Sequence, residues 1–247
     1  MAIFTKFYSN AIIRNRLQDS RLSSSMFGSQ FPAEKKRIKS DERKLILHLN
    51  VSHSSKSLVS GGARNFLSSL KFPHSVTEMN LWKDENNVKY SLGHSQAKMN
   101  ILQGVGTSTD EELFNPIYKA ANYINSVDIV LISSPMWNYS VPYPLKQFID
   151  TIVQPGINFT DENQSSISHL QGRYLVVFSS AGASYNKDSH VKDFMNPYLG
   201  QVFRLMGFDK QEVVFIQGTS SKSREELVQF TEEKSLEAAT AINNHYL

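Results

Sequence analysis

The middle of the chain holds a turn rich in aromatic residues, shortly after the apolar segment "SVDIVLI". The turn reads "PMWNY" (135–139). Proline has no N–H group and fixes its φ at about −65°, so Pro135 is expected to end a strand and lead the chain over the rim of a sheet. Trp137 and Tyr139 could then flank the face of a flat heteroaromatic ring, while the Asn138 amide and freed backbone N–H groups bond its polar edge. The alternative is a tight connection whose aromatic side chains only cover the core.

A second segment, "NVSHSSKS" (50–57), follows the apolar run "KLILHLN" and combines hydroxyl groups with a cation. Ser55 and Ser57 stand on either side of Lys56 at the expected start of a helix. Hydroxyls, free N–H groups and the positive end of a helix dipole together suit a phosphate group. The alternative is an ordinary serine N-cap.

A third segment, "SSAGASYN" (179–186), follows the apolar run "YLVVF". Gly182 has no Cβ, so the backbone could approach a flat ligand closely there. The alternative is a flexible loop. If the three segments meet at one edge of a sheet, they describe a site for a phosphorylated flat ring.

Apolar periodicities of strand and helix type alternate along the chain, which predicts an α/β fold: a doubly wound, five-stranded parallel sheet with helices on both faces. Capping patterns place helix starts at Thr109, with Glu112 in the third helical position, and at Ser223, with Glu226. No strand pattern is visible over 82–108, and "QGVGT" within it is expected to be a loop. In such sheets, ligands bind beyond the carboxyl ends of the strands. Strands are predicted over 44–50, 75–81, 126–133, 172–180 and 211–217, and helices over about 58–70, 109–125, 144–153, 191–206 and from 223 onward.

The composition excludes several kinds of chemistry. The chain has no cysteine, which rules out thiolate nucleophiles, cysteine-bound zinc, iron–sulfur clusters and disulfides, so redox chemistry would need a bound cofactor. No apolar window approaches the roughly 20 residues that cross a bilayer, and no membrane partner is expected. Motifs of serine hydrolases, P-loop enzymes and zinc proteases are missing. His53 is expected to be an exposed loop residue, and Lys146 and Asp150 a surface ion pair.

Basic residues are concentrated near the N-terminus. Residues 1–40 carry eight Lys or Arg and two acidic residues, a net charge of +6, whereas 41–247 carry 18 and 21, a net charge of −3. The folded part therefore gives no reason to expect nucleic-acid binding. The Arg- and Ser-rich leader is typical of an organellar presequence, which predicts a mitochondrial location, with plastid and cytoplasmic locations as alternatives. A disordered basic tail is the other interpretation of 1–40, and 41–247 is expected to form one domain.

An ordered set of sequence blocks resembles the flavodoxin-like quinone reductases and azoreductases. The resemblance extends over about residues 43–247 and implies a flavodoxin-like fold. It also implies an FMN-dependent NAD(P)H oxidoreductase that reduces quinones or azo compounds by two-electron, ping-pong hydride transfer, usually as a homodimer. FMN is favoured over FAD because no added adenine-binding domain is present. The blocks are "SPMWNY" (134–139), "PLKQFID" (144–150), "PGINF" (155–159), "LQGRYLVVFSSAG" (170–182) and "NPYLGQVFRLMGF" (196–208).

The resemblance also assigns site residues. Trp137 stands where tyrosine is common in the family, and "SAGA" replaces the S-R-G-G of azoreductases, so Ala183 fits the turn only with a negative φ. Flavin phosphate contacts fall on Ser52, Ser55, Lys56 and Ser57, and isoalloxazine contacts on Pro135, Met136, Trp137, Asn138, Tyr139, Ser180, Ala181, Gly182 and Ala183.

Two other functions remain open at this point. Because a flavin carries the hydride itself, no catalytic side chain is expected, and the chain could equally hold a flavin as a one-electron carrier of flavodoxin type. Such carriers are usually strongly acidic for docking, whereas the folded part here has a net charge of only −3. The third possibility is a non-enzymatic module that binds a protein through the exposed aromatic turn.

Overall fold

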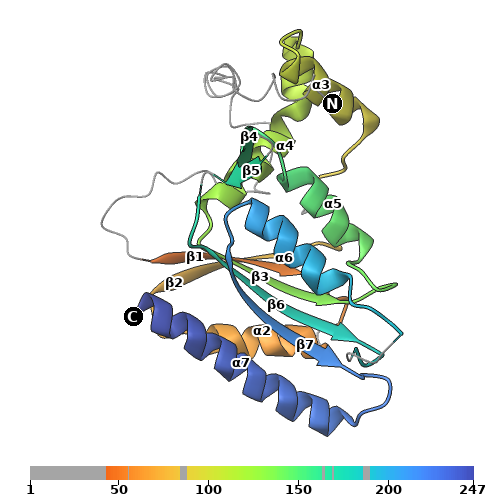
Figure 1. The fold of residues 1–247 in the computed structure, drawn as a ribbon, viewed down its shortest axis with the longest axis vertical. Helices are drawn as coiled ribbons and strands as arrows, with labels where there is room; N and C mark the ends of the chain where they lie inside the picture. The colour runs from red at the N-terminus through yellow and green to blue at the C-terminus, as the bar shows by residue number, and fades with distance from the viewer. Residues whose placement is uncertain (1–42, 55, 84–87, 163–164, 169, 186–189) are drawn as a thin grey trace.

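The computed structural model describes residues 43–54, 56–83, 88–162, 165–168, 170–185 and 190–247 (Figure 1). None of the helices in these ranges is long and apolar enough to cross a bilayer. The leader at 1–40 and Ser55 of the second segment lie outside the described residues. The elements are β1 (Lys44–Asn50), α2 (Leu58–Ser68), β2 (His74–Asn80), α3 (Leu92–Leu102), α4 (Ser108–Ser126), β3 (Ile129–Pro135), α5 (Tyr143–Ile152), β4 (Phe159–Glu162), β5 (Ser165–Ser168), β6 (Tyr174–Ala181), α6 (Met195–Leu205), β7 (Lys210–Gln217) and α7 (Arg224–Tyr246).

Five strands form one parallel sheet in the order β2-β1-β3-β6-β7, and β4 and β5 form a separate antiparallel hairpin. Helices α4, α5 and α6 pack on one face through a buried cluster that includes Ile124, Phe148 and Phe203. Helices α2 and α7 pack on the other face through Phe66 and Ile242. Figure 1 shows α2 and α7 below the sheet and α5 and α6 above it. The predicted doubly wound, flavodoxin-like sheet is confirmed.

The central strands are buried on both faces. Six of the seven residues of β3 and seven of the eight of β6 are buried, as expected where helices cover both sides of a parallel sheet. Gly62 of α2 lies against this layer: a Cβ there would stand 2.6 Å from Phe178 of β6 and 2.9 Å from Thr231 of α7. Glycine therefore lets α2 approach both the sheet and α7, which explains a residue that helix propensity alone disfavours.

The predicted start of α4 is wrong by two residues. Thr107, and not Thr109, is the N-cap: its N–H donates to Asp110 Oδ2 (2.9 Å), and its Oγ1 accepts from the Asp110 N–H (3.3 Å). The capping box is therefore formed by Thr107 and Asp110, whereas the sequence pattern predicts Thr109 and Glu112. The α7 cap is as predicted, since Ser223 Oγ accepts the N–H of the third helical residue at 3.1 Å.

Helix α6, helix α3 and the β4–β5 hairpin also differ from prediction. Helix α6 begins at Met195, four residues later than 191, because Asp193 Oδ1 accepts the N–H groups of Met195 (2.8 Å) and Asn196 (3.0 Å) and so fixes the first turn there. Helix α3 and the β4–β5 hairpin were not predicted. In α3 only Ala97 is buried, so this helix has no apolar stripe that a sequence pattern could reveal.

Arg173 ties the helices to the edge of the sheet opposite the predicted site. Its guanidinium donates to the carbonyls of Ile124 (2.8 Å) and Val127 (3.3 Å) at the end of α4 and to the Met206 carbonyl at the end of α6. The group also lies 4.0 Å from the centroid of the Phe208 ring. Burial lowers the pKa of Arg173 to about 10, so the side chain stays cationic and satisfies carbonyls that the helices leave unpaired.

Candidate functional site

The parallel sheet brings the three predicted segments to one edge. Strands β1, β3 and β6 are neighbours, with Asn50 opposite Ser133 and Pro135 opposite Ser180. Beyond the paired residues, the N–H of Met136 donates to the Ser180 carbonyl at 2.7 Å. The chain segments after the first, third and fourth predicted strands therefore lie side by side at the carboxyl ends, where open α/β sheets bind ligands.

The aromatic segment forms a tight turn directly after β3. Pro135 is the last residue of the strand, as predicted, and Trp137 and Ser140 exchange two backbone hydrogen bonds of 3.0 Å each. Between them, Asn138 (φ 48°) and Tyr139 (φ 68°) are the non-glycine residues with positive φ in the described part of the chain. Two consecutive positive φ values define a type I′ turn, which usually contains glycine at its second position. A tyrosine held there is strained by about 1–2 kcal/mol, and such strain concentrates at functional sites.

The polar groups of this turn divide into bonded and free donors. The N–H groups of Met136 and Trp137 donate to the carbonyls of Ser180 and Ser140, so they are not among the backbone donors that the turn frees. The N–H groups of Asn138 and Tyr139 and the Asn138 side-chain amide bond to none of the described residues. Trp137 is 38% and Tyr139 49% exposed, an unusual degree for large rings that serve only the core. The turn thus has free amide groups at Asn138 and Tyr139, and the residues on either side of Asn138 in the sequence carry exposed aromatic rings.

The segment after β1 is a compact serine loop. Ser52 is buried, and its Oγ donates to the Ser54 carbonyl (3.1 Å) and accepts the Ser54 N–H (3.3 Å), so this hydroxyl is engaged within the loop. Ser57 occupies the N-cap position of α2, but its side chain makes no capping hydrogen bond. Lys56 is exposed beside it. The hydroxyl of Ser57 and the first N–H groups of α2 are therefore placed as an anion-binding helix start requires.

The segment after β6 is braced by the loop that precedes α7. The N–H groups of Gly218, Thr219 and Ser220 donate to the carbonyls of this segment, and a Cβ on Gly182 would stand 2.6 Å from Ser220 Oγ. A larger residue here would displace the Ser220 hydroxyl from its present position. Ala183 does not adopt a positive φ, which meets the condition that the sequence set for an alanine in this turn. Ala181 is buried and Gly182 and Ala183 are exposed, so the outer side of the loop is open.

Trp82 is a site residue that the sequence did not reveal. It follows β2, and its indole Nε1–H donates to the Val51 carbonyl of the serine loop at 2.6 Å. Its ring lies 5.3 Å from that of Trp137 and 5.6 Å from that of Tyr143, centroid to centroid. Trp82 stands in a polar stretch without periodicity, so only the pairing of β2 with β1 brings it to the site. His53 is an exposed loop residue, as predicted, and meets the edge of the Trp82 ring at 6.4 Å.

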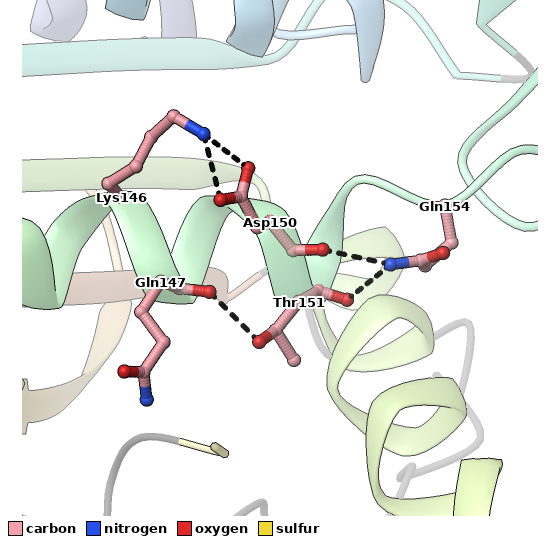
Figure 2. A network of polar contacts seen from close by, with 5 residues as sticks. All are labelled: Lys146, Gln147, Asp150, Thr151 and Gln154. Atoms are coloured by element: carbon pink, nitrogen blue, oxygen red, sulfur yellow. Dashed lines mark hydrogen bonds and ion pairs between the residues drawn. The ribbon is translucent and has the colours of Figure 1, made fainter. Parts of the chain in front are cut away.

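The polar residues of α5 have a structural role, as predicted for Lys146 and Asp150. Figure 2 shows the Lys146 ammonium against both Asp150 carboxylate oxygens, at 2.6 and 2.8 Å, on a half-exposed pair. Thr151 Oγ1 donates to the Gln147 carbonyl, and Gln154 Nε2 donates to the carbonyls of Asp150 and Thr151 at 3.0 Å each, which caps the helix. These contacts fix the end of α5 and leave no free acid or base among the five residues for chemistry.

Comparison with known proteins places the chain in a family. The sequence model described as having a flavodoxin-like fold matches residues 44–238. The chain belongs to this family. Within the flavodoxin-like-fold family, it is 32% identical over 127 residues to FMN-dependent NADH:quinone oxidoreductase 2 of Pseudomonas syringae pv. tomato, across 50% of this chain and 61% of that protein. It is 29% identical over 182 residues to FMN-dependent NADH:quinone oxidoreductase 1 of Bradyrhizobium diazoefficiens, across 71% of this chain and 87% of that protein.

Solved structures share the fold of the flavodoxin-like-fold family. An FMN-dependent NADH-azoreductase from Bacillus anthracis, crystallised in complex with FMN, superposes with a TM-score of 0.73 at 20% identity, across 81% of this chain and 99% of that one. An NAD(P)H:quinone oxidoreductase from Methanothermobacter marburgensis gives a TM-score of 0.60 at 16% identity, across 81% and 96%. At these identities the likeness concerns the fold, and the residues at the strand ends must carry any argument about function.

Proposed function

We propose that the chain is an FMN-dependent NAD(P)H oxidoreductase that reduces quinones or azo compounds. The observation that carries the proposal is the turn at 137–140, where a strained backbone combines the free Asn138 amide with two exposed aromatic neighbours, Trp137 and Tyr139. A turn that only ended a strand would not need a tyrosine at positive φ. The names of its relatives, FMN-dependent NADH:quinone oxidoreductases, support the same cofactor and donor.

The residues present fit FMN at both of its ends. Ser57 offers a hydroxyl without a capping partner, and exposed Lys56 offers a cation, beside the positive end of α2, so a phosphate would be held by charge and by N–H groups. The Asn138 amide and the two free N–H groups of the turn can bond the polar edge of an isoalloxazine ring. Trp137 supplies an aromatic wall beside that ring.

The chain's own contribution to the reaction is orientation and electrostatics. FMN, when bound, takes a hydride from NAD(P)H and passes it to the acceptor, so no nucleophile is needed. N–H donors aimed at the ring edge favour the negative charge that accumulates there on reduction. The exposed faces of Trp137 and Tyr139 leave room beside the site for a nicotinamide and then an acceptor to stack in turn. This open surface favours an enzyme over a one-electron carrier, whose flavin needs no space for a nicotinamide.

Assembly and location form a second part of the proposal. We infer a homodimer, and exposed apolar side chains on the α3–α4 unit, Leu92, Met99 and Leu113, offer surface that a second copy could cover. We also infer that the basic leader at 1–40 directs the chain to mitochondria, on the strength of its Arg- and Ser-rich, acid-poor composition. Sedimentation of the purified chain tests the first inference, and import of a leader fusion into isolated mitochondria tests the second.

Steady-state kinetics test the proposed activity. With FMN-loaded protein, NADH or NADPH is varied at several fixed concentrations of a small quinone and of an azo dye. If the nicotinamide and the acceptor occupy the same open face in turn, the double-reciprocal plots should show parallel lines. A chain that binds FMN but oxidises neither NADH nor NADPH with any acceptor would be a carrier, and a chain that takes up no FMN would leave the interaction module as the better explanation.

A further inference from the structure

Trp82 joins three loops at the carboxyl edge of the sheet. Its backbone N–H donates to Asn80 Oδ1 (2.9 Å) at the end of β2, and its indole N–H donates to the Val51 carbonyl (2.6 Å) after β1. Its ring packs against Trp137 of the turn after β3, at 5.3 Å between centroids with an interplanar angle of 51°. The Trp82 side chain thus connects the serine loop with the aromatic turn, and its backbone is bonded to the end of the edge strand β2.

The position of Trp82 is itself fixed by the paired strand ends. Asn50 and Asn80 stand opposite each other in the β1–β2 register, and the Leu81 N–H donates to the Asn50 carbonyl at 3.0 Å. Asn50 Oδ1 accepts the Ser52 N–H at 3.0 Å. The backbone before Trp82 and the start of the serine loop are therefore held in one hydrogen-bonded unit. This unit restricts the position of the indole ring.

The rings around Trp82 form a surface that is more open than a core. Tyr143 at the start of α5 meets Trp82 edge to face at 5.6 Å and is 68% exposed, and Trp137 is 38% exposed. Rings that only completed the core would be buried. Instead, Tyr143, Trp82 and Trp137 make a continuous aromatic wall beside the free amide groups of Asn138. Such a wall favours flat, extended partners, because stacking increases with the area of the rings in contact.

We propose that Trp82 is a positioning residue that fixes the orientation of Trp137 and thereby favours two-ring acceptors, such as naphthoquinones, over one-ring benzoquinones. This inference rests on the proposed function for its acceptor, although the contact between the two indoles does not. Trp82 acts through Trp137 and the loop backbone. An aromatic pair of this kind corresponds to a factor of about three to ten in binding, and that factor is the expected size of the preference.

The composition of the chain makes the contact directly observable. The chain contains two tryptophans, which are Trp82 and Trp137. Trp82→Phe and Trp82→Ala therefore leave Trp137 as the single indole, and Trp137→Phe leaves Trp82. Indoles in contact couple in circular dichroism, so the wild-type spectrum should contain a paired band that is absent from the sum of the single-tryptophan spectra. In Trp82→Ala the emission of Trp137 should move to longer wavelength as its ring becomes more exposed, whereas Trp82→Phe should largely preserve it.

Kinetics on the FMN-loaded variants complete the test. For Trp82→Ala, KM for a naphthoquinone should rise about three- to tenfold relative to KM for a benzoquinone, and Trp82→Phe should restore most of the ratio. Phe230→Ala, which removes a ring of similar exposure (37%) on α7, is the matched control and should not change the ratio. Unchanged Trp137 emission and an unchanged KM ratio in an active Trp82→Ala enzyme would overturn this inference alone. A wild-type chain without NAD(P)H-dependent activity would overturn the proposed function, and the acceptor role of Trp82 with it.

Discussion

Replacement of Asn138 separates two contributions of this residue: its side-chain amide as a ligand contact, and its tolerance of a positive φ in the turn. Asn138 has φ 48°, a conformation that asparagine tolerates, glycine adopts freely and alanine resists. Asn138→Ala removes the amide and adds strain, whereas Asn138→Gly removes the amide and relieves strain. The pair therefore distinguishes loss of a ligand contact from distortion of the turn.

The magnitudes follow from the bonds at stake. Both variants leave one polar group of the bound flavin without its partner, which costs about 1–2 kcal/mol or roughly a five- to thirtyfold rise in the Kd for FMN. Without FMN, Asn138→Ala should lower the free energy of unfolding by about 1 kcal/mol, and Asn138→Gly should not lower it. Quenching of flavin fluorescence measures the first quantity, and urea unfolding of the apoprotein measures the second.

Wild-type FMN affinity in both variants would contradict a bond between Asn138 and the flavin. In that case the Asn138 amide does not bond the ligand, and the positive φ at the turn would be a consequence of the strand ending alone. Weaker FMN binding in Asn138→Ala but not in Asn138→Gly would locate the effect in the backbone and not in the side-chain amide.

Three further predictions concern stability and organisation. Arg173→Leu should lower the free energy of unfolding by about 3 kcal/mol in urea titrations, because three helix-end carbonyls lose a cationic donor; a loss below that of an average surface substitution would contradict the role given to this side chain. The pKa of Glu78 is lowered to about 2, chiefly by His48 at 3.6 Å, so its stabilising effect is present above pH 4.5 and is lost as the pH falls toward 2. Glu78→Gln should therefore flatten the stability profile over that window, by less than about 1 kcal/mol because the carboxylate is half exposed, and an unchanged profile would argue against the pair. Deletion of residues 1–40 should leave the melting temperature and FMN content unchanged while abolishing import into mitochondria; loss of FMN on deletion would make the leader part of the domain.

The sequence contained enough information for the sheet because burial on both faces leaves a strong pattern. Strands β3 and β6 each begin with an unbroken apolar run, and Pro135 ends β3 because it has no N–H group. The same physics explains the failures. Helix α3 buries only Ala97, so its sequence has no periodic apolar pattern. The start of α4 depends on which of two threonines, Thr107 or Thr109, forms the reciprocal hydrogen bonds with a carboxylate three residues later.

The candidate site was predictable only where a residue's type sets its conformation or its chemistry. Asn138 was chosen for its amide, but the positive φ that leaves this amide free is a property of the folded turn. The sequence indicates Gly182 as a place for ligand approach, and the structure also places it against the hydroxyl of Ser220, 38 positions away in the chain. Trp82 joins the site through strand pairing alone, which no local pattern records.

The absorption spectrum of the purified chain, recorded without oxygen, shows whether this protein is an FMN-dependent NAD(P)H oxidoreductase. We expect the bands of oxidised flavin, their loss on addition of one equivalent of NADH or NADPH, and their return on addition of a quinone, with FMN released by acid. A chain that stays colourless after incubation with FMN, or a bound flavin that neither NADH nor NADPH reduces, would contradict the proposed function.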